Sequence, residues 1–389
     1  MTSRTRLWVL AVSTPVIAFA VLGGYLGQVL AKDETYQHLR VFEDVVSLVV
    51  NNYVEEVDVK KAMAGAMRGM ADGLDPDTAF LSPDLVKTVE NHDPLGPADI
   101  GVEVSRQYYL RVLEVRPGSS AAKAGLRTGD FIRAIDGKAT RDMSAYEGTR
   151  LLHGQPGSKL TLLIIRGNAA DPHEVALTRE KPVAPELTTK MADSATGYVH
   201  VVDFGTDIPT RLKQAIDALA KTGAQRYVID LRGSAIGDID DGVAAARLFV
   251  KSGTLTVRQT KGAKTPLTAQ AGDGAITAPV ALLVDTGTSG AAEVFAAALS
   301  GNDRAQLIGE HTPGRAARQQ LVKLPDGSGL LLTNMRYLTP DGKDIHEKGL
   351  EPKVAVDEPD VEFGSEPPAA DPILDRALQI LGEKEKKAA

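Results

Sequence analysis

Residues 284–320 read VDTGTSGAAEVFAAALSGNDRAQLIGEHTPGRAARQQ. Together with the apolar residues just before them, they predict a strand over 278–284, which a small-residue turn joins to a helix over 290–299. A second strand is predicted over 305–308, and a Gly/Pro loop carrying Arg315 and Gln319 follows it. A strand that turns into a helix N-terminus gathers backbone N–H groups at one point. A nucleophile or an oxyanion would be placed at such a point.

The chain before this stretch alternates strands with helices, which is typical of an α/β layer. The expected elements share short apolar or amphipathic patterns: strand 197–204, helix 208–222, strand 227–231, helix 238–249, strand 253–259 and a flexible lobe to Gly274. One last amphipathic helix is expected over 371–381. The segment from residue 35 to 81 predicts helices whose apolar residues form one face.

The amino-acid composition argues against several classes of function. The chain has 389 residues, enough for two or three domains, and is 43% hydrophobic and 24% charged. A net charge of −7 argues against general nucleic-acid binding. The absence of Cys excludes disulfides, thiolate metal sites and a cysteine nucleophile. No Gly-rich phosphate motif or metal-ligand cluster is visible, so we expect no cofactor and no metal.

Residues 7–30 carry no charge, follow Arg4 and Arg6, and are long enough to span a bilayer. Basic residues ahead of the run place the N-terminus in the cytoplasm. Two interpretations stay open: an uncleaved anchor, favoured by Trp8 and the length of the run, or a signal peptide cleaved after a site that includes Ala31. The anchor predicts a single-pass inner-membrane protein with its bulk on the periplasmic or extracytoplasmic side.

Residues 101–166 combine short strands, a brief helix, a longer helix and an Asp136-Gly137 hairpin signal. Strands are expected over 110–115, 131–135 and 159–165, and helices over 119–124 and 144–152. This block resembles a PDZ domain. The resemblance implies that a peptide adds as a strand to a sheet edge while backbone amides hold its free carboxylate. The peptide-binding residues would be Ile100, Gly101, Val102, Glu103 and Val104.

The stretch 284–320 itself resembles the catalytic segment of the C-terminal processing (tail-specific) serine peptidases. Residues 51–81 resemble the N-terminal helical region of the same family, and residues 330–356 resemble its closing strand and the turn that follows. In that family a serine nucleophile precedes a Glu by three residues, a general-base lysine follows, and a glutamine lies four residues beyond it. Here the Glu is Glu293, so the nucleophile position is Gly290. The base position is Arg315, 315 − 290 = 25 residues on, and the glutamine is Gln319.

Both reacting groups of the dyad are therefore missing. Glycine has no hydroxyl, and arginine stays charged at any relevant pH, so it cannot accept a proton. Ser289, one residue away, is the alternative nucleophile, although a one-residue shift at a turn re-aims the side chain. Thr286, Thr288 and Ser289 are otherwise expected to fix the turn and the helix start.

The oxyanion region departs from the family as well. The family places an Asn-Pro-Gly-Gly loop after the strand that here ends at Asp230-Leu231. This chain has Gly233-Ser234-Ala235-Ile236-Gly237, without the proline and one glycine. Gly233, Gly237 and the helix residue Ala291 would form the region. Asp230 and Arg232 are expected to be a structural pair, and His346 has no acid partner at recognisable spacing.

The resemblance implies an α/β plus PDZ architecture in five parts. These are a membrane anchor or signal segment (1–34), a helical region (35–95), a PDZ domain (96–182), a mixed α/β core of the ClpP/crotonase-like peptidase type (183–360), and a flexible linker with a C-terminal helix (361–389).

Three functions are open. The first is a membrane-anchored pseudopeptidase that binds protein C-termini or unstructured polypeptides without cleaving them. The second is an active serine-type endopeptidase that uses Ser289 to cleave exported proteins near their C-termini. The third is an assembly scaffold in which the helical region forms a homo-oligomer and the PDZ block recruits a partner.

Overall fold

The computed structural model describes residues 36–167, 172–183, 186–359, 361–365 and 370–388. The expected membrane span over 7–30 lies outside these residues. Among the helices of the described part, none is both long and apolar enough to cross a membrane. The chain divides into two compact units, residues 1–67 and 68–389.

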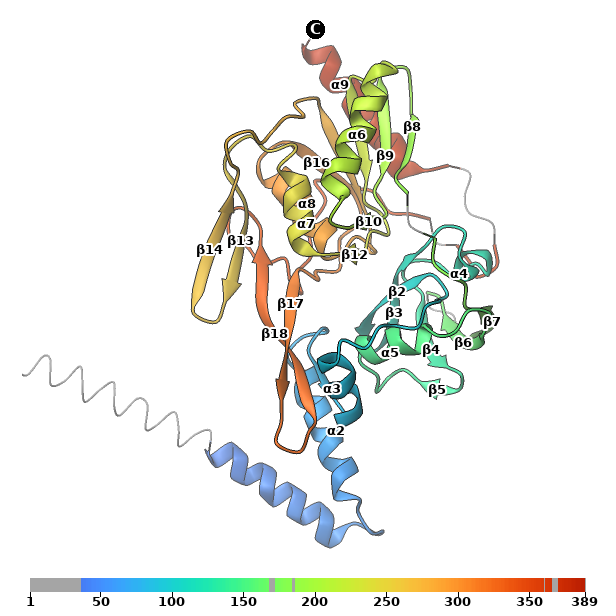
Figure 1. Cartoon of the computed structure of the whole chain (residues 1–389), viewed down its shortest axis with the longest axis vertical. Helices are drawn as coiled ribbons and strands as arrows, with labels where there is room; N and C mark the ends of the chain where they lie inside the picture. The colour runs from blue at the N-terminus through green and yellow to red at the C-terminus, as the bar shows by residue number, and fades with distance from the viewer. Residues whose placement is uncertain (1–35, 168–171, 184–185, 360, 366–369, 389) are drawn as a thin grey trace, which may run out of the picture. The chain divides into compact units, whose positions relative to one another are not determined.

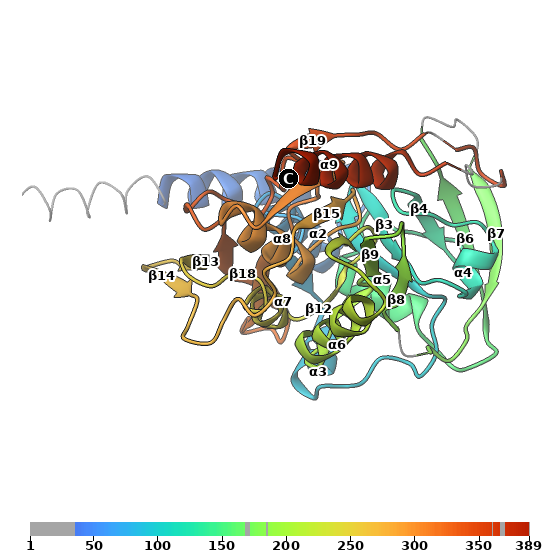
Figure 2. The same ribbon diagram turned by 90° about the horizontal axis from the view of Figure 1, so that it is seen from above.

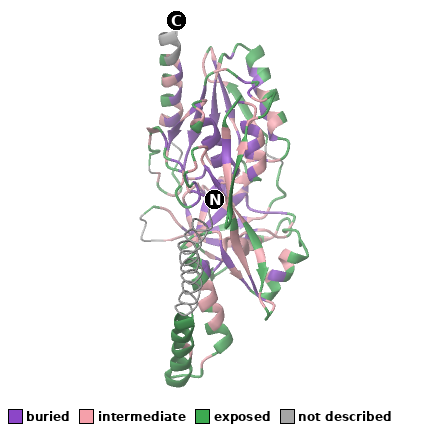
Figure 3. Cartoon of the chain, turned by 90° about the vertical axis from the view of Figure 1, so that its left-hand side faces the viewer, coloured by how far each residue is buried: buried purple, intermediate pink, exposed green. Residues whose placement is uncertain are grey.

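The described part of the first unit is helical, as the apolar spacing predicts. A helix covers residues 36–52, and α2 (Val59–Asp72) begins after a turn. The acidic residues Glu55, Glu56 and Asp58 between these helices are exposed. Apolar side chains of the first helix are exposed too, and Figure 3 shows this helix in the colour of exposed residues. Its apolar face therefore has no cover within the described unit.

The core of the second unit is a six-stranded sheet in the order β19-β16-β15-β11-β9-β8, parallel except for β8. Its strands are β8 (Thr188–Met191), β9 (Thr196–His200), β11 (Arg226–Asp230), β15 (Val280–Val284), β16 (Ala305–Gly309) and β19 (Val354–Ala355). The α/β layer predicted from the alternation of elements is confirmed.

Helices cover both faces of this sheet (Figure 2). Along β15, Leu282 and Val284 pack with α6 (Ile208–Lys221), α7 (Ile239–Ala246) and α8 (Ala291–Gly301). The alternate residues of β15 face the C-terminal helix α9 (Pro372–Ala388). A strand turns successive side chains to opposite faces, so this fully apolar strand is buried on both sides. Helix α9 confirms the last amphipathic helix that the sequence predicts over 371–381.

A second, antiparallel sheet has the order β1-β18-β13-β14, with β17 paired to β18. Its strands are β1 (Ala79–Leu81), β13 (Thr254–Thr260), β14 (Ala263–Thr268), β17 (Ala317–Lys323) and β18 (Gly329–Leu338), and α3 (Pro83–Glu90) follows β1. The prediction of a flexible lobe before Gly274 is wrong in part, because β14 folds back on β13 as a hairpin (Figure 1). Cross-strand pairing orders this polar segment, which periodicity does not reveal.

The single strand expected over 197–204 is broken. The chain pairs with β11 only as far as His200 and then forms β10 (Asp203–Phe204), which pairs with β12 (Ile236–Gly237). The apolar pattern runs through both pieces, so only the change of partner strand reveals the break.

The PDZ block forms a sheet in the order β2-β3-β4-β6-β7, with β5 paired to β4. Its elements are β2 (Val102–Gln107), β3 (Tyr109–Val115), α4 (Ser120–Lys123), β4 (Phe131–Ile135), β5 (Lys138–Ala139), α5 (Ala145–Leu152), β6 (Lys159–Ile165) and β7 (His173–Thr178). The predicted hairpin is confirmed, with φ of 48° at Asp136 and 75° at Gly137, as a type I′ turn requires. Strand β2 ends the sheet, so one of its edges has no strand partner in the described chain.

Candidate functional site

The turn between β15 and α8 is held by buried polar side chains. Asp285 Oδ1 accepts hydrogen bonds from the N–H groups of Gly287 and Gly233 and from the Thr288 hydroxyl, each at 3.0 Å. The Thr288 hydroxyl also lies 2.9 Å from the carbonyl oxygen of Leu231. Burial raises the pKa of Asp285 to about 6, against the opposing effect of these bonds. The expected turn-fixing role of Thr288 is confirmed, and the turn is joined to the loop that begins at Gly233.

Gly290 keeps a backbone suited to a nucleophile although it has no side chain. It is the N-cap of α8, with φ of 61° and ψ of −115°. This conformation is strained for other residues, and such strain is characteristic of functional turns. A Cβ built on Gly290 would have no described atom within 4 Å. A serine would therefore fit the space at this position.

Ser289 is placed less favourably as a nucleophile. It is buried, with 2% of its surface exposed. Its N–H donates to the carbonyl of Ser234 at 3.0 Å, which ties the residue to the loop after β11. A buried hydroxyl is poorly accessible to a polypeptide backbone, so the geometry favours a structural role for Ser289.

Glu293 joins the nucleophile position to the base position. Its side chain is fully buried, and Oε2 accepts the N–H of Gly290 at 3.1 Å and the N–H of Arg315 at 2.7 Å. Oε1 accepts the N–H of Gly314 at 2.7 Å and the hydroxyl of Thr312 at 2.5 Å. The backbone N–H groups of Gly290 and Arg315 thus donate to the same oxygen atom, Oε2 of Glu293. One buried carboxylate therefore joins the two positions at which the sequence predicts the dyad.

The side chain of Arg315 pairs with a carboxylate. Its Nε and Nη2 donate to Oδ1 of Asp77 at 2.9 and 2.5 Å. Burial lowers the pKa of Arg315, but the charge of Asp77 and its hydrogen bond outweigh this and raise the pKa overall. A guanidinium held in this way cannot act as a general base. Gln319 lies on β17, where it is exposed and its amide nitrogen donates to the hydroxyl of Thr333 at 3.4 Å. That hydroxyl in turn lies 3.2 Å from Oδ1 of Asp75.

The loop expected to bind an oxyanion has most of its amides engaged. The N–H of Gly233 donates to Asp285, and the N–H of Ser234 closes a turn within the loop. The N–H of Ala235 donates to Oε2 of Glu114 at 3.1 Å. Amides bonded in this way cannot stabilise a developing negative charge unless these bonds break.

The other two residues of the predicted oxyanion region have packing roles. Gly237, with φ of 129°, pairs with Phe204, and an added Cβ would lie 2.2 Å from the carbonyl oxygen of Phe204. Ala291 begins α8, and a Cβ on Gly242 of α7 would lie 2.3 Å from its carbonyl oxygen. Both positions bring backbones into close contact. The N–H group of Ala291, the first residue of α8, remains a backbone hydrogen-bond donor at the helix start.

The predicted peptide-binding residues divide between the PDZ core and its edge. Ile100, Val102 and Val104 bury their side chains in the PDZ core, so a peptide would meet their backbone. The N–H of Gly101 donates to Oδ1 of Asp99 at 2.8 Å. A peptide carboxylate at this amide would have to compete with the Asp99 side chain.

Glu114 of the PDZ sheet was not identified from the sequence, because its partner Ala235 lies 121 residues away. It is buried, and Glu103 is its cross-strand partner. Burial raises the pKa of Glu114 to about 8, with the charge of Glu103 adding to the effect and the bond from Ala235 opposing it. Burial also raises the pKa of Glu103. At neutral pH Glu114 is therefore largely protonated against the loop.

Glu114→Gln is expected to remove a pH dependence of stability. The folded state keeps a proton on Glu114 that the unfolded chain loses above its ordinary pKa, so wild-type stability falls as pH rises from about 4.5 to about 8. Relative to wild type, the variant should gain about 3 kcal/mol in unfolding free energy between pH 5 and pH 8. Urea denaturation at both pH values measures this. Exposed Glu351→Gln is the control, and an equal gain there would contradict the assignment.

Arg232 links the loop after β11 to the C-terminal segment. The predicted pair with Asp230 is confirmed at 2.6 Å. The same guanidinium also contacts Asp371 at 2.7 Å, just before α9, and Glu358 at 3.0 Å. The N-terminal end of the 233–237 loop is thus anchored to residues more than a hundred positions away.

Within the described chain, His346 has no acid partner at short sequence spacing, as expected, but a carboxylate from a distant segment lies near its ring. Its Nε2 lies 3.8 Å from Oδ1 of Asp75. Asp75 is far away in the sequence, so no local spacing could have indicated the pair.

Comparisons with known proteins agree with these observations. The model of peptidase family S41 matches residues 195–356, and that of the PDZ domain matches residues 111–166. The carboxy-terminal processing protease CtpA of Bacillus subtilis (strain 168) is 30% identical over 374 residues, which cover 92% of this chain and 79% of the relative. A carboxyl-terminal-processing protease of Synechocystis sp. is 31% identical over 90% of this chain and 83% of the relative.

A solved structure described as the photosystem II D1 C-terminal processing protease is also similar to this chain. The TM-score is 0.67 at 29% identity, over 81% of this chain and 92% of the other. The order of the PDZ domain and the peptidase-type core is therefore seen in both sequence and structure.

Proposed function

Because this chain belongs to the carboxyl-terminal processing protease family, we propose that it captures protein C-termini and extended polypeptides through its PDZ domain without cleaving them. The observation that carries the proposal is the pair of residues around Glu293. Gly290 offers a bare α-carbon at the nucleophile position, and Arg315 is a permanent cation paired with Asp77.

The altered loop at residues 233–237 supports the same proposal. Acyl transfer needs donors directed at the oxygen that becomes negative. The N–H groups of Gly233 and Ala235 are instead bonded to carboxyl groups of Asp285 and Glu114. Three requirements of the reaction are thus unmet together: the nucleophile, the base and part of the oxyanion site.

The PDZ domain supports the binding half of the proposal. Strand β2 is the end strand of its sheet, and α5 packs beside it. An extended peptide would bond its backbone to this edge and place alternate side chains toward α5. Such recognition needs a sheet edge and backbone donors, and neither depends on the missing dyad.

We also propose that residues 7–30 anchor the chain in a membrane, with the PDZ domain and core on the extracytoplasmic side. The uncharged run and the basic residues before it support this orientation. Exported proteins with accessible tails would then be the available partners.

Binding without turnover is testable with a matched pair of peptides. An unstructured peptide with a free C-terminal carboxylate should bind the full chain with a Kd of roughly micromolar order, about tenfold tighter than the same peptide with a C-terminal amide. Fluorescence anisotropy measures both affinities, and mass spectrometry of the recovered peptide should find it intact.

A serine-reactive fluorophosphonate distinguishes the alternative. The folded wild-type chain should remain unlabelled, since no activated hydroxyl is available. Labelling at Ser289, or cleavage that disappears in Ser289→Ala, would establish an active endopeptidase and contradict the proposal.

A further inference from the structure

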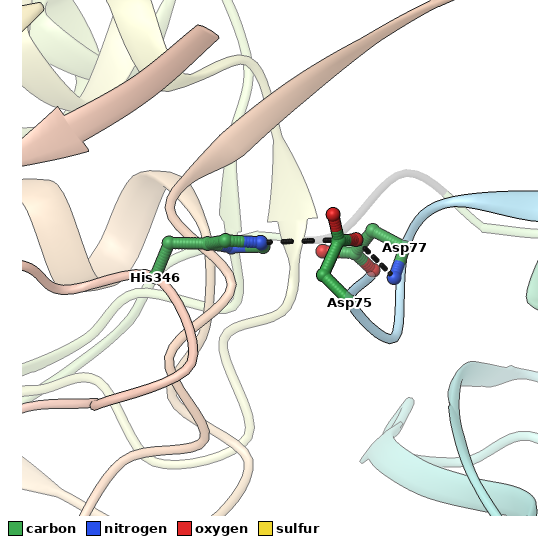
Figure 4. Close-up of side chains that lie close together, drawn as sticks. All are labelled: Asp75, Asp77 and His346. Atoms are coloured by element: carbon green, nitrogen blue, oxygen red, sulfur yellow. Dashed lines mark hydrogen bonds and ion pairs between the residues drawn. The ribbon is translucent and has the colours of Figure 1, made fainter. Parts of the chain in front are cut away.

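Three potential metal ligands from distant segments meet beside the degenerate dyad. Asp75 and Asp77 lie between α2 and β1, and His346 follows β18. One ligand atom from each side chain lies within 4.8 Å of the other two. Figure 4 shows the imidazole of His346 directed toward the Asp75 carboxylate, with Asp77 behind it. A cluster of acids alone would mean little, so the state of the histidine decides its significance.

His346 is buried without a hydrogen-bond partner. Only 2% of its surface is exposed, and neither Nδ1 nor Nε2 has a hydrogen-bond partner among the described residues. The nearest acid oxygen is Oδ1 of Asp75, at 3.8 Å from Nε2. This separation is too long for a hydrogen bond. Buried polar groups without partners are rare in folded proteins, and a role in binding an ion is one accepted explanation.

Existing contacts hold the two carboxylates in place. Oδ1 of Asp75 accepts the N–H groups of Asp77 at 2.9 Å and Thr78 at 2.7 Å and the Thr333 hydroxyl at 3.2 Å. Oδ2 accepts only the Thr78 hydroxyl, at 2.9 Å, among the described residues, and is the oxygen that a cation would reach. In Asp77 both bonds from Arg315 fall on Oδ1. No hydrogen bond from the described part of the chain reaches Oδ2 of Asp77, so this oxygen keeps its lone pairs for another cation. Each carboxylate has a support that would orient it as a ligand.

We propose that Asp75, Asp77 and His346 bind a divalent cation, with Zn²⁺ as the best match. One imidazole and two carboxylates are ligands that Zn²⁺ takes in proteins, and water would complete a tetrahedral shell. Two carboxylates and the Arg315 guanidinium leave a net charge of −1 when the imidazole is neutral, which favours a cation. To bind one ion, the three ligand atoms, which lie within 4.8 Å of one another, would need to approach by only a fraction of that separation.

Such an ion would connect three segments of the degenerate site. It would join the loop before β1 to the loop after β18 and, through Asp77, hold Arg315 where a lysine base would otherwise lie. This goes beyond peptide capture, because the ion would stabilise the core whether or not a peptide is bound.

Zn²⁺ binding is measured on the full chain in mild detergent, without a polyhistidine tag and after treatment with EDTA. Isothermal titration with ZnCl₂ should give one ion per chain. The melting temperature should rise by about 4 °C at a hundredfold excess over Kd. Mg²⁺ at the same concentration should have a smaller effect, since it does not favour imidazole.

Two histidine variants separate this site from general Zn²⁺ binding. His346→Gln should weaken binding by at least about tenfold and abolish the melting shift, because one of three ligands is lost. His311→Gln is the matched control, since His311 is exposed and lies 4.0 Å from Glu351. Its Zn²⁺ response should equal that of wild type.

If His346→Gln does not fold, Co²⁺ titration of the wild type provides the test. A visible d–d spectrum of a four-coordinate N/O site that Zn²⁺ displaces would support the proposal. The proposal fails if Zn²⁺ leaves the melting temperature unchanged, or shifts wild type and His346→Gln equally.

Discussion

Gly290→Ser combined with Arg315→Lys is expected to produce cleavage of an unstructured polypeptide at least about a thousandfold above the wild-type background. The backbone at position 290 has the φ of 61° and ψ of −115° of a strained turn, and a Cβ there meets no described atom within 4 Å. A lysine at position 315 can lose its proton, as arginine cannot, while the neighbouring Asp77 carboxylate would raise the lysine pKa and limit the fraction of neutral amine. Quantitative mass spectrometry of a tailed reporter protein measures the rate.

The single variants are the controls for this gain. Gly290→Ser alone would have a hydroxyl beside a permanent cation, and Arg315→Lys alone would have a base beside a bare α-carbon. Each should stay at background, because the dyad acts as a unit. A folded double variant that also stays at background would mean that the bonded loop at residues 233–237 has lost its oxyanion function too. Loss of the dyad alone would then be an insufficient explanation.

Glu293→Gln is expected to lower the unfolding free energy by about 4 kcal/mol, which is the largest stability effect at the site. The two carboxyl oxygens of Glu293 accept four hydrogen bonds, three of them from backbone N–H groups. A glutamine amide turns its NH₂ group toward two of these donors, so buried polar groups would be left unsatisfied. Urea denaturation at constant pH measures the loss.

The exposed Glu351→Gln provides the comparison, with an expected change within about 0.5 kcal/mol. Hydrogen exchange should also speed up at the amides of Gly314 and Arg315, which Glu293 binds directly. An unchanged stability together with unchanged exchange would show that Glu293 is not what joins the two halves of the site.

Much of the fold can be predicted from local sequence patterns. The apolar run of β15, the small-residue turn and helix α8 follow from periodicity and turn chemistry, as do the strands and helices of the PDZ domain. The absence of a hydroxyl at Gly290 and of a titratable amine at Arg315 is a property of residue identity alone. The sequence therefore determined the family and the residue types at positions 290 and 315 before any contact was known.

The contacts around the site were decided by the tertiary structure. Arg315 meets Asp77 across 238 positions, and Glu114 meets Ala235 across 121. The hairpin strand β14 is likewise ordered by pairing with β13, and not by its own pattern. Periodicity records only which face of an element is buried, because helix and strand geometry repeat over a few residues. Which side chains meet across two buried faces depends on how the elements pack, and that is settled only when the whole chain folds.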